Sequence, residues 1–169
     1  MRHLLLLLLL VVSLRADPAP AAPDLDVSGL EDDSVAAARI VAWCRQLGIE
    51  ARLGEKSGKS LALTAEKLSV APKVTLDSVD RLVIYNFYEG RPGNRENAAL
   101  RLLVAKVNAQ YNVCSLFVDA EGDLCFQYNL SFDDRLSARL FRRQLLHANE
   151  TAREILRRHE EDFLPYLAK

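Results

Sequence analysis

The chain has 169 residues, and its 22 Lys and Arg against 23 Asp and Glu give a formal net charge of −1 at pH 7. Half of the residues are hydrophobic, 27% are charged, and Gly and Pro number only 7 and 6. This composition excludes collagen-like and broadly disordered classes. The near-neutral charge gives no reason to expect a nucleic-acid partner.

A leucine-rich run near the N-terminus indicates export. Met1–His3 is a short basic start, Leu4–Leu14 is an apolar core, and Arg15–Ala22 is rich in small residues. This is the order of a secretory signal peptide, and we expect cleavage after Ala16 or Ala21. The protein would then work in the bacterial periplasm or outside the cell, without a membrane contact. An uncleaved N-terminal anchor is the alternative, although the apolar core is shorter than the roughly 17–25 residues of a spanning helix.

The rest of the chain divides into a linker and one domain. Residues 22–33 contain Pro, Ala and acidic residues but no Lys or Arg, a composition typical of a flexible charged tether. Residues 34–165 contain the helix and strand patterns of a single domain, which is long enough to bury one core.

The first helix is predicted from a stripe of apolar residues. It begins at Asp33 or Ser34, either of which can cap it, and Gly48 ends it, with Ile49 closing a Schellman motif. The residues that recur at three- and four-residue spacing are Ala37, Ile40, Val41, Cys44 and Leu47.

Strand signals follow this helix. Ser60–Thr64 and Val74–Leu76 are weak strand candidates, and Pro72 interrupts this region. Leu82–Tyr88 is a strong candidate because it is rich in β-branched and aromatic residues, and it is apolar or aromatic on both faces.

The second helix is predicted to begin near Asn94, which is a good cap, after the loop at residues 90–93. Its expected apolar face consists of Ala99, Leu100, Leu103, Val104 and Val107. It ends near Asn108–Asn112, since Asn tolerates the left-handed conformation.

The clearest local structure is a hairpin. Val113–Val118 and Leu124–Leu130 are two strands, and a three-residue loop with Gly122 in the left-handed conformation pairs Asp119 with Asp123. In this register one face is wholly apolar. The other face carries the pairs Phe117–Cys125, Ser115–Gln127 and Val113–Asn129.

This register has two consequences. Cys114 and Cys125 point to opposite faces and are not bridged to each other. The three cysteines, Cys44 among them, are predicted to be buried thiols, with one disulfide as the alternative. The second face is not fully polar, so we expect an interface there, formed by Val113, Phe117, Cys125 and Gln127.

A long last helix is predicted after a cap at Asp133 or Asp134, with a possible kink at residues 147–149 and an end at Pro165. Its apolar stripe contains Phe141, Leu145, Ala148, Ala152, Ile155, His159 and Phe163. Its charges have mixed signs, which favours a solvated face. The most one-sided subset, and the candidate patch for an anionic partner, is Arg139, Arg142 and Arg143.

No motif predicts a catalytic, cofactor or metal site. His147 and His159 are too far apart on one helix to share a metal, and no HExxH, CxxC or GxSxG motif is present. The segment Ser57–Ser60 is incomplete as a phosphate loop because Leu53 stands where glycine is required.

The order helix, strands, helix, hairpin, helix predicts an α+β fold, with an antiparallel sheet and helices largely on one face.

The chain resembles the YbjN-type family. The likeness is strongest over residues 95–145: an apolar helix with Asn108 and Asn112 at its end, a strand, the Asp119–Asp123 turn and the strand Leu124–Leu130. Upstream, Leu82–Gly90 fits the strand that precedes the helix. The resemblance implies a fold similar to type III secretion chaperones, often dimeric, and a sensory or regulatory role without catalytic residues. Dedicated secretion chaperones are cytoplasmic, whereas this chain carries an export signal.

The leading hypothesis is therefore an exported, non-enzymatic module that binds a protein partner or forms a homodimer, with a chaperone-like or regulatory role. A periplasmic carrier of a small ligand is the alternative, and a secreted enzyme is a weaker one.

Overall fold

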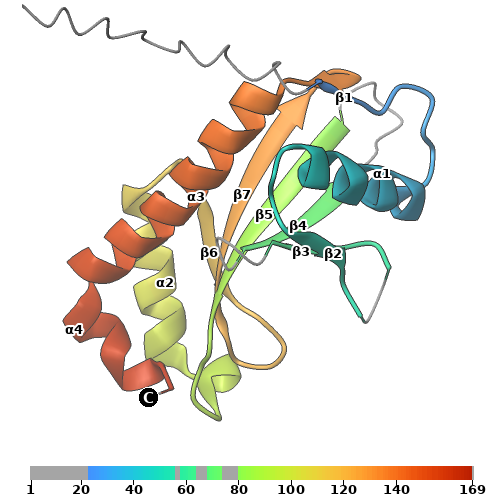
Figure 1. Ribbon diagram of the computed structural model, residues 1–169. Helices are drawn as coiled ribbons and strands as arrows, with labels where there is room; N and C mark the ends of the chain where they lie inside the picture. The colour runs from blue at the N-terminus through green and yellow to red at the C-terminus, as the bar shows by residue number, and fades with distance from the viewer. Residues whose placement is uncertain (1–22, 56–57, 64–67, 74–79, 169) are drawn as a thin grey trace, which may run out of the picture.

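The computed structural model describes residues 23–55, 58–63, 68–73 and 80–168, and its centre is a six-stranded antiparallel sheet (Figure 1). The strands lie in the order β2-β3-β4-β5-β7-β6. Their bounds are Ala51–Leu53 (β2), Leu61–Leu63 (β3), Leu68–Lys73 (β4), Asp80–Tyr88 (β5), Ser115–Val118 (β6) and Leu124–Phe132 (β7). The longest pairing joins β5 to β7 over their full length.

Three helices pack on one face of this sheet (Figure 1). They are α1 (Asp33–Gln46), α2 (Ala98–Gln110) and α3 (Ala138–Arg158). Helix α1 contacts β2 and β4, α2 contacts β6, and α3 contacts β5 and β7. The short elements η1 (Asn94–Glu96), α4 (Glu160–Phe163) and η2 (Leu164–Tyr166) complete the helical part. The expected α+β class, with helices largely on one side of an antiparallel sheet, is confirmed.

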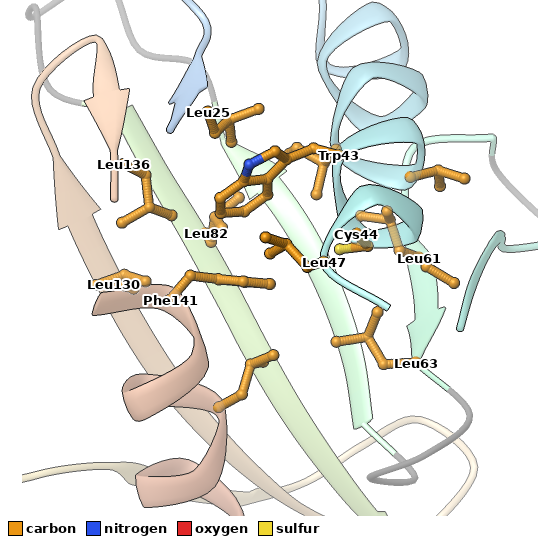
Figure 2. Close-up of a cluster of buried hydrophobic side chains, with 14 of the residues drawn as sticks. Leu25, Trp43, Cys44, Leu47, Leu61, Leu63, Leu82, Leu130, Leu136 and Phe141 are labelled. Atoms are coloured by element: carbon orange, nitrogen blue, oxygen red, sulfur yellow. The ribbon is translucent and has the colours of Figure 1, made fainter. Parts of the chain in front are cut away.

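The core consists of two clusters of buried apolar side chains between the helices and the sheet. The first joins α1, the start of α3 and the sheet (Figure 2), and in it the rings of Trp43 and Phe141 lie 4.8 Å apart between centroids. Cys44 is buried in this cluster, and burial raises the pKa of its thiol to about 12. The second cluster joins α2, the end of α3 and the β6–β7 hairpin, for example through Leu100, Ile155 and Phe126.

Helix α1 ends as the sequence predicts. Gly48 has a φ of +70°, its N–H donates to the Arg45 carbonyl, and the N–H of Ile49 donates to the Cys44 carbonyl. These are the two hydrogen bonds of a Schellman motif. The start differs by one residue, because the Asp32 carboxylate accepts from the N–H groups of Ser34 and Val35.

The hairpin register is also confirmed. Ser115 lies opposite Gln127 and Phe117 opposite Cys125, and Gly122 adopts a φ of +92° in the turn. The first strand is shorter than expected, since it begins at Ser115 rather than at Val113.

The expected tether is partly a strand of the fold. Leu25–Asp26 forms β1, which pairs with Arg135–Leu136 (β8) in a separate two-stranded sheet. Leu25 is 2% exposed and Val27 is also buried in the first cluster. The Trp43 indole Nε1 donates to the Pro23 carbonyl at 2.6 Å. The acidic composition concealed two apolar residues at alternating positions, and burying them outweighs the solvation of their neighbours.

The last helix begins later than predicted, directly after the β1–β8 strand pair. Ser137, not Asp133 or Asp134, caps α3, and its hydroxyl accepts from the Leu140 N–H. Asp134 instead has a φ of +44° in the turn before β8. The Asp24 carboxylate accepts from the Ala138 N–H at 3.3 Å, so the first turn of α3 is satisfied by two oxygens.

The predicted apolar stripe of α3 is buried from Phe141 to Ile155, and the helix runs through residues 147–149 without a break. The helix stops at His159 instead of continuing to Pro165, which lies inside η2. Beyond His159 the chain turns, and α4 brings Phe163 back into the second cluster.

Helix α2 begins later than predicted. Asn97 caps it by accepting from the Leu100 N–H, and Ala99 is exposed rather than part of the apolar face. Asn94 is buried in η1, where its amide donates to the Gly122 carbonyl at 3.0 Å and to the Tyr166 carbonyl at 2.8 Å. A single side chain thereby ties the hairpin turn and the C-terminal segment to the start of α2.

The strand predictions before β5 are confirmed only in part. Leu61–Leu63 lies within the expected Ser60–Thr64, whereas β2 and β4 were not predicted. The candidate Val74–Leu76 lies outside the described residues. Pro72 does not interrupt β4, because β3 pairs with residues 68–70 and no described strand lies on that side of the backbone at Pro72. A missing N–H carries no cost at such an edge.

The burial of β1 can be tested by truncating one side chain. Leu25→Ala should lower the free energy of unfolding by about 2–4 kcal/mol, because it removes a fully buried leucine. Val35→Ala, at a helix position that is 52% exposed, should change it by less than about 0.5 kcal/mol. Urea unfolding followed by circular dichroism measures both. Equal effects would mean that β1 is not docked.

The role of Asn94 yields a second test. Asn94→Ala leaves two carbonyl groups without their donor and should cost about 2–3 kcal/mol of unfolding free energy. Asn129→Ala, at an exposed position of β7, is the matched control and should be near neutral. If the two variants unfold at the same urea concentration, Asn94 does not hold the two segments together.

Candidate functional site

The sheet has a second face that none of the described helices covers. Leu82 and Ile84 of β5 lie in the first core cluster, under the helices. Because successive side chains of a strand point to opposite faces, Val83, Tyr85 and Phe87 lie on the other face. We call this side of the sheet the open face.

The hairpin extends the open face across two more strands. Leu116 and Phe126 point toward the helices in the second cluster. Phe117, Cys125 and Gln127 therefore lie on the open face. The register aligns Phe87, Cys125 and Phe117 in one row across the three strands, and Tyr85, Gln127 and Ser115 in the next row.

Aromatic side chains dominate this surface. The rings of Tyr85 and Phe87 lie 5.7 Å apart between centroids, and Phe87 is 49% exposed. Phe117 is half-buried at the far side of the row. We call Tyr85, Phe87 and Phe117 the aromatic patch. Contiguous apolar side chains exposed in this way usually mark a contact surface.

Cys125 lies beneath the aromatic patch and is chemically quiet. It is fully buried, and its Sγ lies 3.5 Å from Asp119 Oδ2 and 3.6 Å from the Asp123 carbonyl oxygen. Burial, followed by the negative charge of Asp119, raises the pKa of this thiol to about 12. A neutral thiol is a poor nucleophile, so the residue contributes packing to the open face.

All three cysteines are free thiols, and Cys114 lies beside the second cluster on the opposite side from Cys125.

Val113 does not join the other three residues of the predicted interface. It lies before β6, is 45% exposed, and lines a shallow hollow of about 310 Å³ between Tyr111 and α3. The prediction for Val113 assumed that the strand began two residues earlier. Whether Phe117, Cys125 and Gln127 bind a partner stays a prediction.

The three arginines of α3 are all exposed, and whether they bind an anionic partner stays a prediction. Arg142 donates to the Leu47 carbonyl at the end of α1, so it closes the contact between two helices. Arg139 is exposed, and Arg143 lines a hollow of about 430 Å³ on the helix side, together with Tyr128, Gln144, Leu146, His147 and Glu150. In this hollow the Tyr128 hydroxyl donates to Gln144 Oε1 at 2.6 Å. None of the described residues that line it is Ser, Thr or Cys.

Among the described residues, no three His, Cys, Asp or Glu side chains lie close enough together to hold a metal ion. No helix within the described residues is long and apolar enough to cross a membrane.

The sequence predicts the hairpin side of the open face but not Phe87, the most exposed aromatic residue of the patch. The signal was present, because Leu82–Tyr88 is apolar at both odd and even positions. The positions of the helices decide whether the odd-numbered or the even-numbered side chains of this strand are covered, and the strand sequence alone does not contain those positions.

The edge of the sheet at β6 is closed by a side chain. The Asn108 amide nitrogen donates to the Leu116 carbonyl at 2.9 Å, and its oxygen accepts from the Leu116 N–H at 2.8 Å. This carboxamide takes the place that a neighbouring strand would occupy. The asparagine at the end of α2 therefore has a structural role at the border of the open face.

Comparison with known proteins assigns the family. The model of YbjN, described as "Putative bacterial sensory transduction regulator", matches residues 36–161. The chain belongs to the YbjN family. Among solved structures, it is similar to the crystal structure of YbjN from E. coli, described as "a putative transcription regulator", with a TM-score of 0.53 and 15% identity. That match covers 78% of this chain and 94% of the E. coli chain, and at this identity it shows a shared fold. No curated protein matches the chain.

Proposed function

We propose that this YbjN-family protein is an exported, non-enzymatic module that binds another protein through the open face, in a chaperone-like or regulatory role. The observation that carries the proposal is the aromatic patch on a sheet face that the described helices leave uncovered. The family description, a sensory transduction regulator, is compatible with a protein that functions by binding another protein.

The chemistry of the patch favours a protein partner. Aromatic side chains are over-represented among the residues that contribute most to protein–protein binding, because they bury a large area with few rotatable bonds. Each Å² of apolar surface removed from water contributes about 25 cal/mol. The polar groups around the patch, such as Gln127, Asn129 and Ser115, can supply the hydrogen bonds of an interface rim.

Export is proposed from the order of basic, apolar and small residues in 1–21. The described fold begins close behind this segment, because the Pro23 carbonyl already accepts from Trp43. Cleavage after Ala21 would leave one residue before this contact, whereas cleavage after Ala16 would leave six. Either product keeps β1 intact.

Binding through the open face can be tested with charge substitutions. Phe87→Glu places a carboxylate beside Tyr85 on β5, and Phe117→Glu places one on β6 at the other end of the row. We expect each to weaken capture of a purified partner at least about tenfold, since a buried unpaired charge is costly in an interface. Binding measured by calorimetry or cross-linking reports the loss, and circular dichroism reports the fold.

The matched control is Leu102→Glu, an equally drastic change at an exposed position of α2 on the helix side. This variant should bind like the wild type. The proposal is wrong if Phe87→Glu binds as well as Leu102→Glu, or if the wild-type chain is a folded monomer that binds no protein.

Export has its own test. The protein isolated from its native host should begin at Asp17 or Ala22, as determined by intact mass and N-terminal sequencing. A chain recovered from the cytoplasm with residues 1–21 still present would contradict export.

A further inference from the structure

We infer that the hollow between α3 and Tyr128 of β7 is a second binding site, for a small aliphatic molecule with a carboxylate at one end and an amine at the other. The hollow lies on the helix side of the sheet, away from the open face. The site is therefore independent of the proposed function. Its charges, its walls and its hydrogen-bond donors each fit this class of ligand.

The hollow has one positive and one negative group at a fixed spacing. Arg143 and Glu150 both line it and are seven residues apart on α3. This spacing places them on one side of the helix, about 10.5 Å apart along its axis. Both are exposed, and within the described part of the chain neither forms an ion pair with the other or with a third side chain. A molecule that carries both charges can pair with both residues.

The wall between these two charges is aromatic and apolar. His147 lies between Arg143 and Glu150 on α3, and its ring meets the Tyr128 ring edge to face, with 5.9 Å between the centroids. Leu146 is 49% exposed and also lines the hollow. Methylene groups gain free energy when they leave water for such a wall. The ligand therefore has an aliphatic stem between its two charged ends.

Gln144 supports the carboxylate at the Arg143 end. The Tyr128 hydroxyl donates to Gln144 Oε1 at 2.6 Å, which leaves the two N–H donors of the amide nitrogen. The described residues supply no acceptor for these donors. Because Gln144 follows Arg143 directly and lines the same hollow, a carboxylate there can accept from both the guanidinium and the amide. Hydrogen bonds to a charged acceptor are the stronger kind.

Glu150, rather than Glu154, is the partner for the amine. Glu150 also borders the second hollow, which contains Glu154. The Glu154 carboxylate is already paired with Arg157 at 2.9 Å and with Arg158 at 2.6 Å. The hollow at Tyr128 has a volume of about 430 Å³, within the range of small-molecule sites. Its charged lining favours a water-soluble ligand over an apolar one.

The first test uses 6-aminohexanoate, which carries the two groups at opposite ends of an aliphatic stem, and calorimetry with the purified protein. We expect binding of this probe. Hexanoate and hexylamine each lack one charged group and should bind at least about tenfold more weakly, because each loses one charge-assisted contact. Glycine, whose charges are too close together to reach both residues, should bind more weakly than 6-aminohexanoate.

The second test exchanges the charges of the protein. Arg143→Glu and Glu150→Arg should each weaken 6-aminohexanoate binding at least about tenfold, because each brings like charges together. The double variant should recover binding, with the ligand reversed in the hollow. Arg139→Glu on α3 and Glu161→Arg on α4 are the controls, since both residues are exposed and neither lines the hollow. They should bind like the wild type, and circular dichroism should show an unchanged fold for all variants.

Three outcomes would overturn the inference: no binding of 6-aminohexanoate, equal binding of hexanoate or hexylamine, or a double variant that does not recover what the single variants lose. Phe87→Glu should leave binding of the probe unchanged, because Phe87 lies on the other side of the sheet. Loss of protein binding in Phe87→Glu and loss of probe binding in Arg143→Glu are therefore separate results. Either site can fail without the other.

Discussion

The pairing of β5 with β7 along nine residues is the constraint on which the rest of the structure depends. Because side chains alternate between the faces, a slip of one residue would move every apolar side chain of a strand to the other side. The register is held by Leu82 and Ile84, which must reach the cluster around Trp43 and Phe141, and by Phe126, which must reach α2 and α3. On its second side β5 is also apolar at Val83, Tyr85 and Phe87. When the residues that face the helices are buried, Tyr85, Phe87 and Phe117 therefore remain on the open face. A slip of register would expose the helix-facing apolar residues instead.

Much of this arrangement could be predicted from local signals. The hairpin follows from Gly122 in a short turn, and the helix stripes follow from apolar spacing, so neither needs knowledge of distant residues. The short strands β1, β2 and β8 have only two or three residues and no measurable periodicity, and they exist because of what they pair with. The predicted cap of α3 was wrong for the same reason. Asp133, Asp134 and Ser137 are all chemically competent, and the choice among them depends on β1 docking from the other end of the chain.

In the candidate site, too, the residues set by local signals were predicted and those set by distant contacts were not. Phe117, Cys125 and Gln127 follow from the hairpin register, which is local. Val113 was misplaced because the chain leaves α2 along the helix side until Asn108 fixes the backbone of Leu116, a contact between residues eight apart that no strand pattern contains. Phe87 was part of a strand that is apolar on both sides, and its exposure depends on where three separate helices settle. The sequence of a strand can show that both of its sides are apolar, but it does not show which side the helices cover.

The edge and the face of the sheet offer different kinds of contact surface. A strand edge offers backbone groups to any extended peptide, with little selectivity. Here the β6 edge is occupied at Leu116 by the Asn108 carboxamide, and the β2 edge has only three residues. Strand addition at β6 would have to displace two good hydrogen bonds before it gained any. The open face has no such obstacle among the described residues, and its side chains, unlike backbone groups, differ from one position to the next. A closed β6 edge and a patterned face therefore favour contacts through side chains over strand addition, in keeping with the binding proposed for the open face.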